Sequence, residues 1–82
     1  MAKLKVYVMW NLDGTHSVAV AARTLKEAAR KLGTSTHEMR RMGWQNRDEL
    51  IEVWADPEHV YRKRIDDRCD RFEVWREARG DG

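Results

Sequence analysis

Two short stretches near the N-terminus, residues 4–10 and 18–22, alternate between apolar and other side chains as a β-strand with one better-buried face does. That face would carry Leu4, Val6, Val8, Trp10, Val18, Val20 and Ala22. The Asp13-Gly14 pair between the two stretches is a strong indication of a tight turn. The sequence therefore predicts that a β-hairpin opens the fold.

Two helices are predicted after the hairpin, because the chain twice shows a capping box, in which a Ser or Thr side chain accepts from a backbone N–H three residues on. Residues 24–27 (Thr-Leu-Lys-Glu) start the first helix, and Gly33 can end it in the left-handed conformation. Its apolar stripe consists of Leu25, Ala28, Ala29 and Leu32. A second capping box at residues 35–38 predicts a short helix over residues 36–42.

A third short helix is predicted to start at Asn46, with Glu49 as its capping partner. Its apolar positions are Leu50, Ile51, Val53 and Trp54. The Asp56-Pro57 pair ends this helix, because a residue before proline avoids the helical conformation.

The last 25 residues are open to two interpretations. A long helix beginning at residues 56–58 would carry the stripe Tyr61, Ile65, Cys69, Phe72 and Trp75. Alternatively, residues 59–61 and 72–75 are β-prone clusters on either side of the polar stretch 66–70. We favour strands, so the predicted fold is α+β, with an N-terminal β-hairpin, three short helices and one or more C-terminal strands completing an antiparallel sheet.

A chain of 82 residues has room for one hydrophobic core. We expect a single domain over residues 1–79 and a disordered tail over residues 80–82. The first helix should bury Leu25, Ala29 and Leu32 against the hairpin face that bears Val6, Val8, Val18 and Val20. Most of the four tryptophans, Trp10, Trp44, Trp54 and Trp75, should also be core, and one left exposed would mark an interface.

The composition indicates a protein of the reducing cytoplasm. The single cysteine, Cys69, allows no internal disulfide, which small secreted domains usually need. The apolar run at the N-terminus is too short for a signal peptide or a membrane span. We therefore expect no membrane role.

Catalysis is not indicated. His16, His37 and His59 lie about twenty residues apart and lack partners at metal-ligand spacing, so neither a metal nor another cofactor is expected. Cys69 lies among acidic residues that disfavour a thiolate, so we expect it to be dispensable. With no phosphate-binding loop or nucleophile motif, we expect a non-enzymatic protein without a small-molecule substrate.

Charge is unevenly distributed along the chain, although the total is only +2. Residues 1–47 contain nine basic residues against three acidic ones, a net charge of +6. Residues 48–58 contain five acidic residues and no basic one, a net charge of −5. Such a division predicts an oriented surface that suits an anionic partner on one side.

The segment 24–44 resembles a helix-turn-helix motif. Ala29 stands four residues before the turn glycine Gly33, Leu32 precedes the turn, and Met39 and Met42 supply the apolar positions of the second helix. The resemblance implies DNA contacts from Ser35, Thr36, His37, Arg40 and Arg41, flanked by backbone contacts from Arg23, Lys26, Arg30 and Lys31. Thr34 departs from the pattern, since a β-branched apolar residue usually anchors the turn.

A second resemblance is to small accessory proteins of phages and other mobile elements. Such proteins carry, in order, a hairpin, a helical segment, a short acidic helix, a proline and a closing strand. The corresponding residues here are Glu27-Ala28-Ala29, Leu32-Gly33 and Ser35, then Asp48-Glu49 and Pro57. The resemblance implies an accessory, non-enzymatic role and assigns no site.

Two functions therefore remain open. The first is a DNA-associated protein that binds through the basic helical segment. The second is an inhibitor or adaptor that binds a host protein complex, such as an anti-CRISPR-like protein on a defence target, through the acidic residues Asp48, Glu49, Glu52, Asp56 and Glu58. DNA binding requires these acids to face away from the basic segment.

Overall fold

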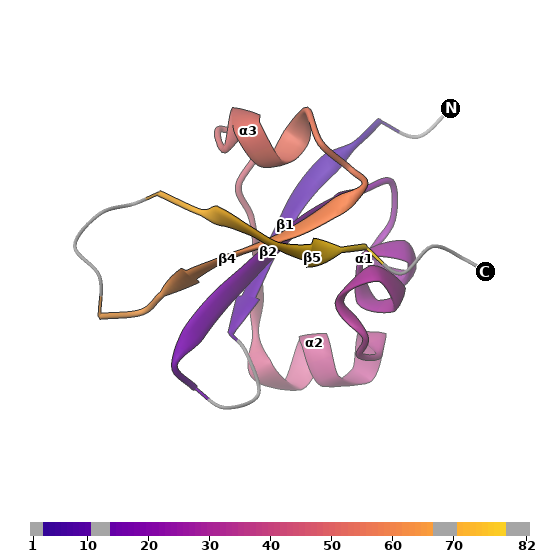
Figure 1. The fold of residues 1–82 in the computed structure, drawn as a ribbon. Helices are drawn as coiled ribbons and strands as arrows, with labels where there is room; N and C mark the ends of the chain where they lie inside the picture. Colours follow the sequence, from indigo (N-terminus) through magenta and orange to yellow (C-terminus); the bar gives the residue numbers. More distant parts are fainter. Residues whose placement is uncertain (1–2, 11–13, 67–70, 79–82) are drawn as a thin grey trace.

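The computed structural model describes residues 3–10, 14–66 and 71–78 and contains a five-stranded antiparallel sheet with strand order β3-β1-β2-β4-β5 (Figure 1). The strands are β1 (Lys5–Trp10), β2 (His16–Ala22), β3 (Trp44–Asn46), β4 (His59–Arg64) and β5 (Glu73–Glu77), and the helices are α1 (Leu25–Leu32), α2 (Thr36–Met42) and α3 (Ile51–Trp54). The predicted α+β class, with its N-terminal hairpin and three short helices, is confirmed.

The predicted hairpin forms β1 and β2, which pair from Lys5 opposite Ala22 to Trp10 opposite Ser17. Gly14 has a φ of 73°, a conformation that glycine adopts without strain. The prediction of the better-buried face of β1 is wrong, because helices cover both faces of the sheet and Tyr7 and Met9 are more deeply buried than Val8 and Trp10. Tyr7 and Met9 therefore lie in the core together with Val18 and Val20.

Local capping determines α1 and α2, as predicted. The Thr24 hydroxyl accepts from the Glu27 N–H, and the Ser35 hydroxyl accepts from the Glu38 N–H, each at 3.1 Å. Gly33 ends α1 in the left-handed conformation, with a φ of 78°.

The third helix differs from the prediction. Residues 44–46 form the edge strand β3, paired with β1, and α3 starts only at Ile51 without a side-chain cap. The Asn46 amide does not cap a helix, because it donates to the Val6 carbonyl at 3.1 Å and to Asp48 at 2.9 Å. A contact with a strand 40 residues away has replaced the local one.

The C-terminal segment adopts the favoured alternative, two strands. β4 pairs with β2, and β5 pairs with β4 with a register irregularity between Val60 and Tyr61. These strands extend the sheet beyond the hairpin, so β5 is one edge of the sheet and β3 the other.

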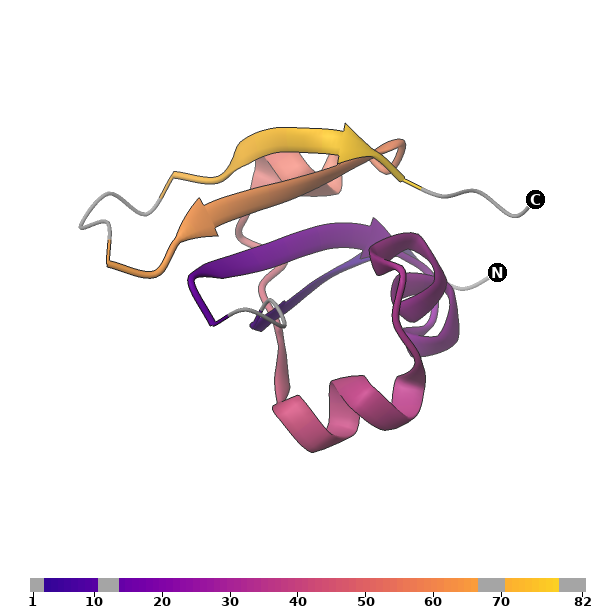
Figure 2. The ribbon, with the colours of Figure 1, turned by 60° about the horizontal axis from the view of Figure 1, so that its bottom comes forward.

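The core has two parts, one on each face of the sheet (Figure 2). On one side α1 and α2 cover the core residues Tyr7, Met9, Val18, Val20, Ala22, Ala28, Ala29, Met39 and Val60. On the other side α3 covers Val6, Ala19, Val53, Tyr61 and Phe72. Leu25, Ala29 and Leu32 do pack on the side of Val18 and Val20, but Val6 and Val8 lie on the opposite face, which corrects the prediction.

The expectation that most tryptophans are core is also wrong. Trp10, Trp44, Trp54 and Trp75 are exposed to 49%, 38%, 46% and 37%. The core is instead filled by alanine, valine and methionine, together with Tyr7, Tyr61 and Phe72. Small side chains let the short helices approach the sheet closely, and such a narrow space does not accommodate indole rings.

Two predictions concern residues outside those that the structure describes. These are the role of Cys69 and the disordered tail at residues 80–82. Among the helices of the described segments, none combines the length and apolar character needed to cross a membrane.

Candidate nucleic-acid interface

A groove runs along the exposed side of the corner formed by α1 and α2. Leu25 and Ala29 line it from α1, and Thr34 lines it from the turn. The predicted contact residues Lys26, Arg30, Ser35, Thr36 and Arg40 also line it. The two helices thus bring together five of the nine residues that the helix-turn-helix resemblance suggested.

The other four predicted residues, Arg23, Lys31, His37 and Arg41, lie outside this groove. Arg23 is exposed just before α1, while His37 and Arg41 are exposed on α2 but do not line the groove. Arg41 pairs with Glu38 at 2.7 Å, and this contact raises the pKa of the guanidinium and lowers the pKa of the carboxyl. Arg40 and Arg41 are neighbours in sequence, yet only Arg40 lines the groove.

Lys31 is not available as a backbone contact. Its Nζ donates to the carbonyls of Ala21 and Pro57, both at 3.0 Å, and pairs with Glu27 at 3.4 Å. The side chain therefore ties α1 to the sheet and to the start of β4.

The remaining cations of the corner form no such contacts with the described part of the fold. Arg23, Lys26, Arg30 and Arg40 are all exposed, and none forms an ion pair with another residue of the described segments. The described residues that line the groove include no carboxylate. We call this set of four cations with Ser35 and Thr36 the basic corner.

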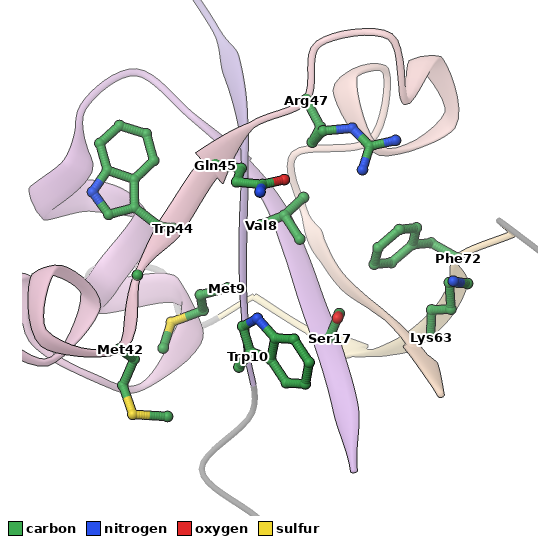
Figure 3. A pocket seen from close by; sticks show the side chains of 11 residues that line it. Val8, Met9, Trp10, Ser17, Met42, Trp44, Gln45, Arg47, Lys63 and Phe72 are labelled. Carbon is green, nitrogen blue, oxygen red and sulfur yellow. The ribbon is translucent and has the colours of Figure 1, made fainter. Parts of the chain in front are cut away.

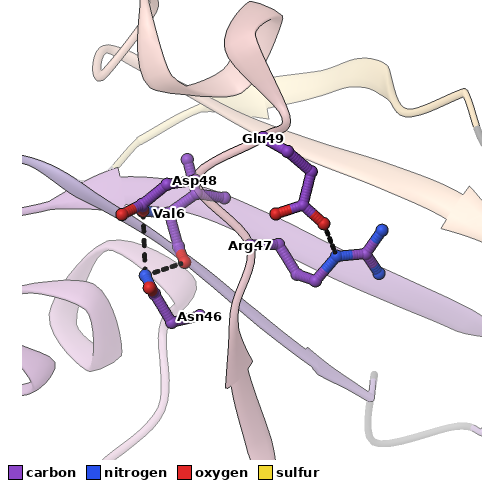
Figure 4. A network of polar contacts seen from close by, with 5 residues as sticks. All are labelled: Val6, Asn46, Arg47, Asp48 and Glu49. Carbon is purple, nitrogen blue, oxygen red and sulfur yellow. Dashed lines mark hydrogen bonds and ion pairs between the residues drawn. The ribbon is translucent and has the colours of Figure 1, made fainter.

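Helix α3, which carries Glu52, packs on the opposite face of the sheet from α1 and α2 (Figures 1 and 2). Glu58 instead lines a pocket together with Lys31 of α1. Asp48 is part of a hydrogen-bond network that connects β1 to the segment after β3 (Figure 4). Its Oδ1 accepts from the Val6 N–H at 2.8 Å and from the Asn46 amide at 2.9 Å. Asp48 therefore supplies a hydrogen bond that the β1 backbone would otherwise lack.

Two more of these acids have partners elsewhere in the chain. Glu49 forms an ion pair with Arg47 (Figure 4). Asp56 accepts from the Tyr61 hydroxyl at 2.8 Å and contacts His59 Nδ1 at 3.0 Å. The hydrogen bond from His59 lowers the pKa of Asp56, and the same contact raises the pKa of His59. Burial and the Asp56 contact raise the pKa of Tyr61 to about 12.

Glu52 and Glu58 are exposed, and neither forms an ion pair within the described part of the chain. Of the five predicted acidic residues, Asp48, Glu49 and Asp56 therefore have partners within the protein. The carboxylates of Glu52 and Glu58 remain available for a binding partner. Sequence alone does not reveal this difference, because the Val6 N–H that Asp48 accepts from lies 42 residues away.

The described residues contain no group of three or more His, Cys, Asp or Glu side chains that could hold a metal ion. Neither the models of protein families, nor the curated proteins, nor the solved structures with which the chain was compared match it.

Proposed function

We propose that this protein is a non-enzymatic accessory protein of phage or mobile-element type that binds DNA through the basic corner in the cytoplasm of its host cell. The observation that carries the proposal is the contrast in how the charges are used. Four cations of the corner reach solvent without an acidic partner in the described segments, whereas three of the five acids between residues 48 and 58 already have partners in the protein. Asp48 and Asp56 accept hydrogen bonds from β1 and β4, and Glu49 pairs with Arg47. Solvated cations are the groups that neutralise phosphates.

The direction of the acidic side supports the same proposal. A carboxylate beside the DNA would repel its phosphates, but the described residues that line the groove include none, and α3 with Glu52 packs on the other face of the sheet from α1 and α2. With only seven residues, α2 is roughly 10 Å long and can reach few base edges. We therefore expect backbone contacts to dominate, with strong salt dependence and little sequence preference.

The test is a fluorescence anisotropy titration of a labelled DNA duplex. If all four cations contact phosphates, affinity should fall by up to roughly 150-fold between 50 and 200 mM salt. The double variant Arg30→Glu/Arg40→Glu should abolish binding. A parent protein that binds no duplex at 50 mM salt would refute the proposal.

The adjacent arginines of α2 offer a matched control. Arg40→Ala should reduce the slope of log affinity against log salt by about one, because one phosphate contact is lost. Arg41→Ala removes the same charge from the neighbouring position, where Glu38 already pairs with it, and should leave the slope unchanged. Equal effects of the two variants would show that general charge, and not the groove, attracts DNA.

A host-protein inhibitor remains the second candidate, because α3 presents exposed apolar groups beside an acid. Ile51 is exposed to 69% and Trp54 to 46%, with Glu52 between them in sequence. Pull-down from host lysate distinguishes the candidates. Nuclease treatment should release the material captured by a DNA-binding protein and should leave a directly bound protein complex in place.

A further inference from the structure

Helix α3 presents an apolar ridge on the surface. Ile51 is exposed to 69% and Trp54 to 46%, whereas Val53 between them is buried. Successive residues of a helix are turned by about 100°, so the burial of Val53 directs Ile51 away from the sheet. The Trp54 ring is held in place, because its Nε1 donates to the Leu4 carbonyl at 3.1 Å.

A hollow lies beside this ridge, between α3 and the residue that precedes β5. Its apolar lining comes from Leu50, Ile51, Val53 and Phe72. Val53 and Phe72 are exposed to only 1% and 8%, so they form a fixed base. The same surface therefore presents an apolar projection next to an apolar recess.

Two opposite charges line this hollow without partners. Glu52 and Arg71 are both exposed, and neither forms an ion pair with another residue of the described segments. Glu49, the other charged residue of the lining, already pairs with Arg47. We call Ile51, Glu52 and Arg71 with the hollow the α3 patch.

A second groove on this face offers no such pair of charges. It is lined by Trp10 and Lys63, among others, and Phe72 borders it as well (Figure 3). Its two cations are engaged within the protein, because Arg47 pairs with Glu49 and Lys63 has an interaction of its own in the chain. The α3 patch is therefore the stronger candidate for a binding surface.

We infer that a second copy of this chain docks on the α3 patch. Ile51 of each copy enters the hollow of the other, and Glu52 of each copy pairs with Arg71 of the other. In a two-fold dimer each contact occurs twice, so one patch that carries both an unpaired anion and an unpaired cation is complementary to itself. A patch built around a helix of four residues is small, so we expect a weak, concentration-dependent dimer.

Such a dimer would carry its two basic corners on opposite outer sides, because α1 and α2 pack on the other face of the sheet from α3 (Figure 2). If the corner binds DNA as proposed above, the dimer should hold two duplex segments together, one on each side. Dimer formation itself does not rest on that proposal.

Sedimentation velocity over a concentration series up to about 1 mM tests the dimer. The parent should shift from monomer towards dimer as its concentration rises. Ile51→Asp should weaken the dimer by at least about 30-fold, because a central contact is lost from both halves. A parent that stays monomeric at about 1 mM overturns the inference and leaves the α3 patch to a different protein.

Charge exchange tests the pairing itself. Glu52→Arg and Arg71→Glu should each weaken the dimer about tenfold, because like charges then face each other. The double variant, and also a mixture of the two single variants, restores opposite charges at both contacts and should associate within about twofold of the parent. Glu58→Arg is the matched control, because it makes the same change of charge outside the α3 patch, and it should leave the dimer unchanged. If neither the double variant nor the mixture associates better than the single variants, the inference fails.

A bead assay tests the bridging of DNA. An immobilised duplex should retain a second, labelled duplex only when the protein is present. Ile51→Asp should bind one duplex as the parent does but lose retention of the second. A dimer that binds no duplex would refute the basic corner and leave the α3 patch standing, whereas a monomer that binds duplex would do the reverse. A dimer that binds duplex without retaining a second one would overturn the bridging arrangement.

Discussion

The two faces of the sheet differ in what their charged side chains do. On the side of α1 and α2, Arg30 and Arg40 extend into a groove and contact no acid of the described segments. On the side of α3, Asp48 and Asp56 accept hydrogen bonds that hold β1 and β4. A charge that already holds the fold would lose those contacts on binding a partner, whereas a solvated charge gives up only water and counterions. The sign of the charge in a cluster thus indicates less about function than whether its side chains are free of contacts within the protein.

The largest expected effect tests whether the basic corner is held rigidly. Met39 is fully buried on α2, between the corner and the sheet. Met39→Ala should lower the free energy of unfolding by about 2 to 5 kcal/mol, because it removes core contacts and leaves a cavity. Leu32→Ala, at a partly buried position of α1, should cost less. Urea unfolding measures both, and an unchanged midpoint for Met39→Ala would show that α2 does not pack on the sheet.

A smaller effect tests the structural role assigned to the acids. Asp48→Ala leaves the Val6 N–H without its acceptor and should destabilise the protein by about 1 to 3 kcal/mol. Glu58→Ala removes an exposed carboxylate from the same acidic segment and should change stability by no more than about 0.5 kcal/mol. If the two variants unfold at the same urea concentration, the contrast between the faces disappears.

The smallest effect is a pH dependence from the Asp56 network. The pKa of Asp56 is lowered, so its contribution is present above its unfolded pKa of about 3.9 and is lost as pH falls through the folded pKa. The pKa of His59 is raised, so its contribution is complete below about 6.5 and is lost as pH rises through the folded pKa. The network should therefore contribute most between about pH 4 and pH 6.5.

Thermal unfolding at about pH 5.5 and pH 8.5 measures this dependence. The parent should melt at a slightly lower temperature at the higher pH, where His59 is neutral. In His59→Gln the contribution of this pair is absent, so the difference between the two temperatures should become smaller. A larger difference in the variant would contradict the assignment.

The elements that could be predicted are those held by contacts close in sequence. The caps at Thr24 and Ser35 act over three residues, and the start of each helix was predicted correctly. Asn46 shows the opposite case. Its sequence context is that of a helix cap, but its amide instead binds the carbonyl of Val6 in a strand 40 residues earlier. The prediction failed there because a tertiary hydrogen bond competed with a local one.

The candidate sites divide in the same way. Lys26, Arg30 and Arg40 could be grouped from sequence, because helical spacing and a short turn bring them to one groove. A second groove, lined by Trp10, Gln45 and Lys63, could not be predicted, because these residues come from three strands whose order is decided by long-range pairing. The alternation in β1 did indicate that Val8 and Trp10 share a face. It did not indicate that the helix on that face would be too short to cover them.

The sequence by itself determined the hairpin, the two capped helices and the sign of each charged region, because these depend on turn chemistry, capping and composition within a few residues. Only the tertiary structure decided which face each strand residue occupies, which charges are engaged and where the tryptophans lie. Those outcomes depend on which element covers each face of the sheet. A helix of four residues on one face left Trp10 exposed, and a strand of three residues at the edge brought Asp48 to Val6.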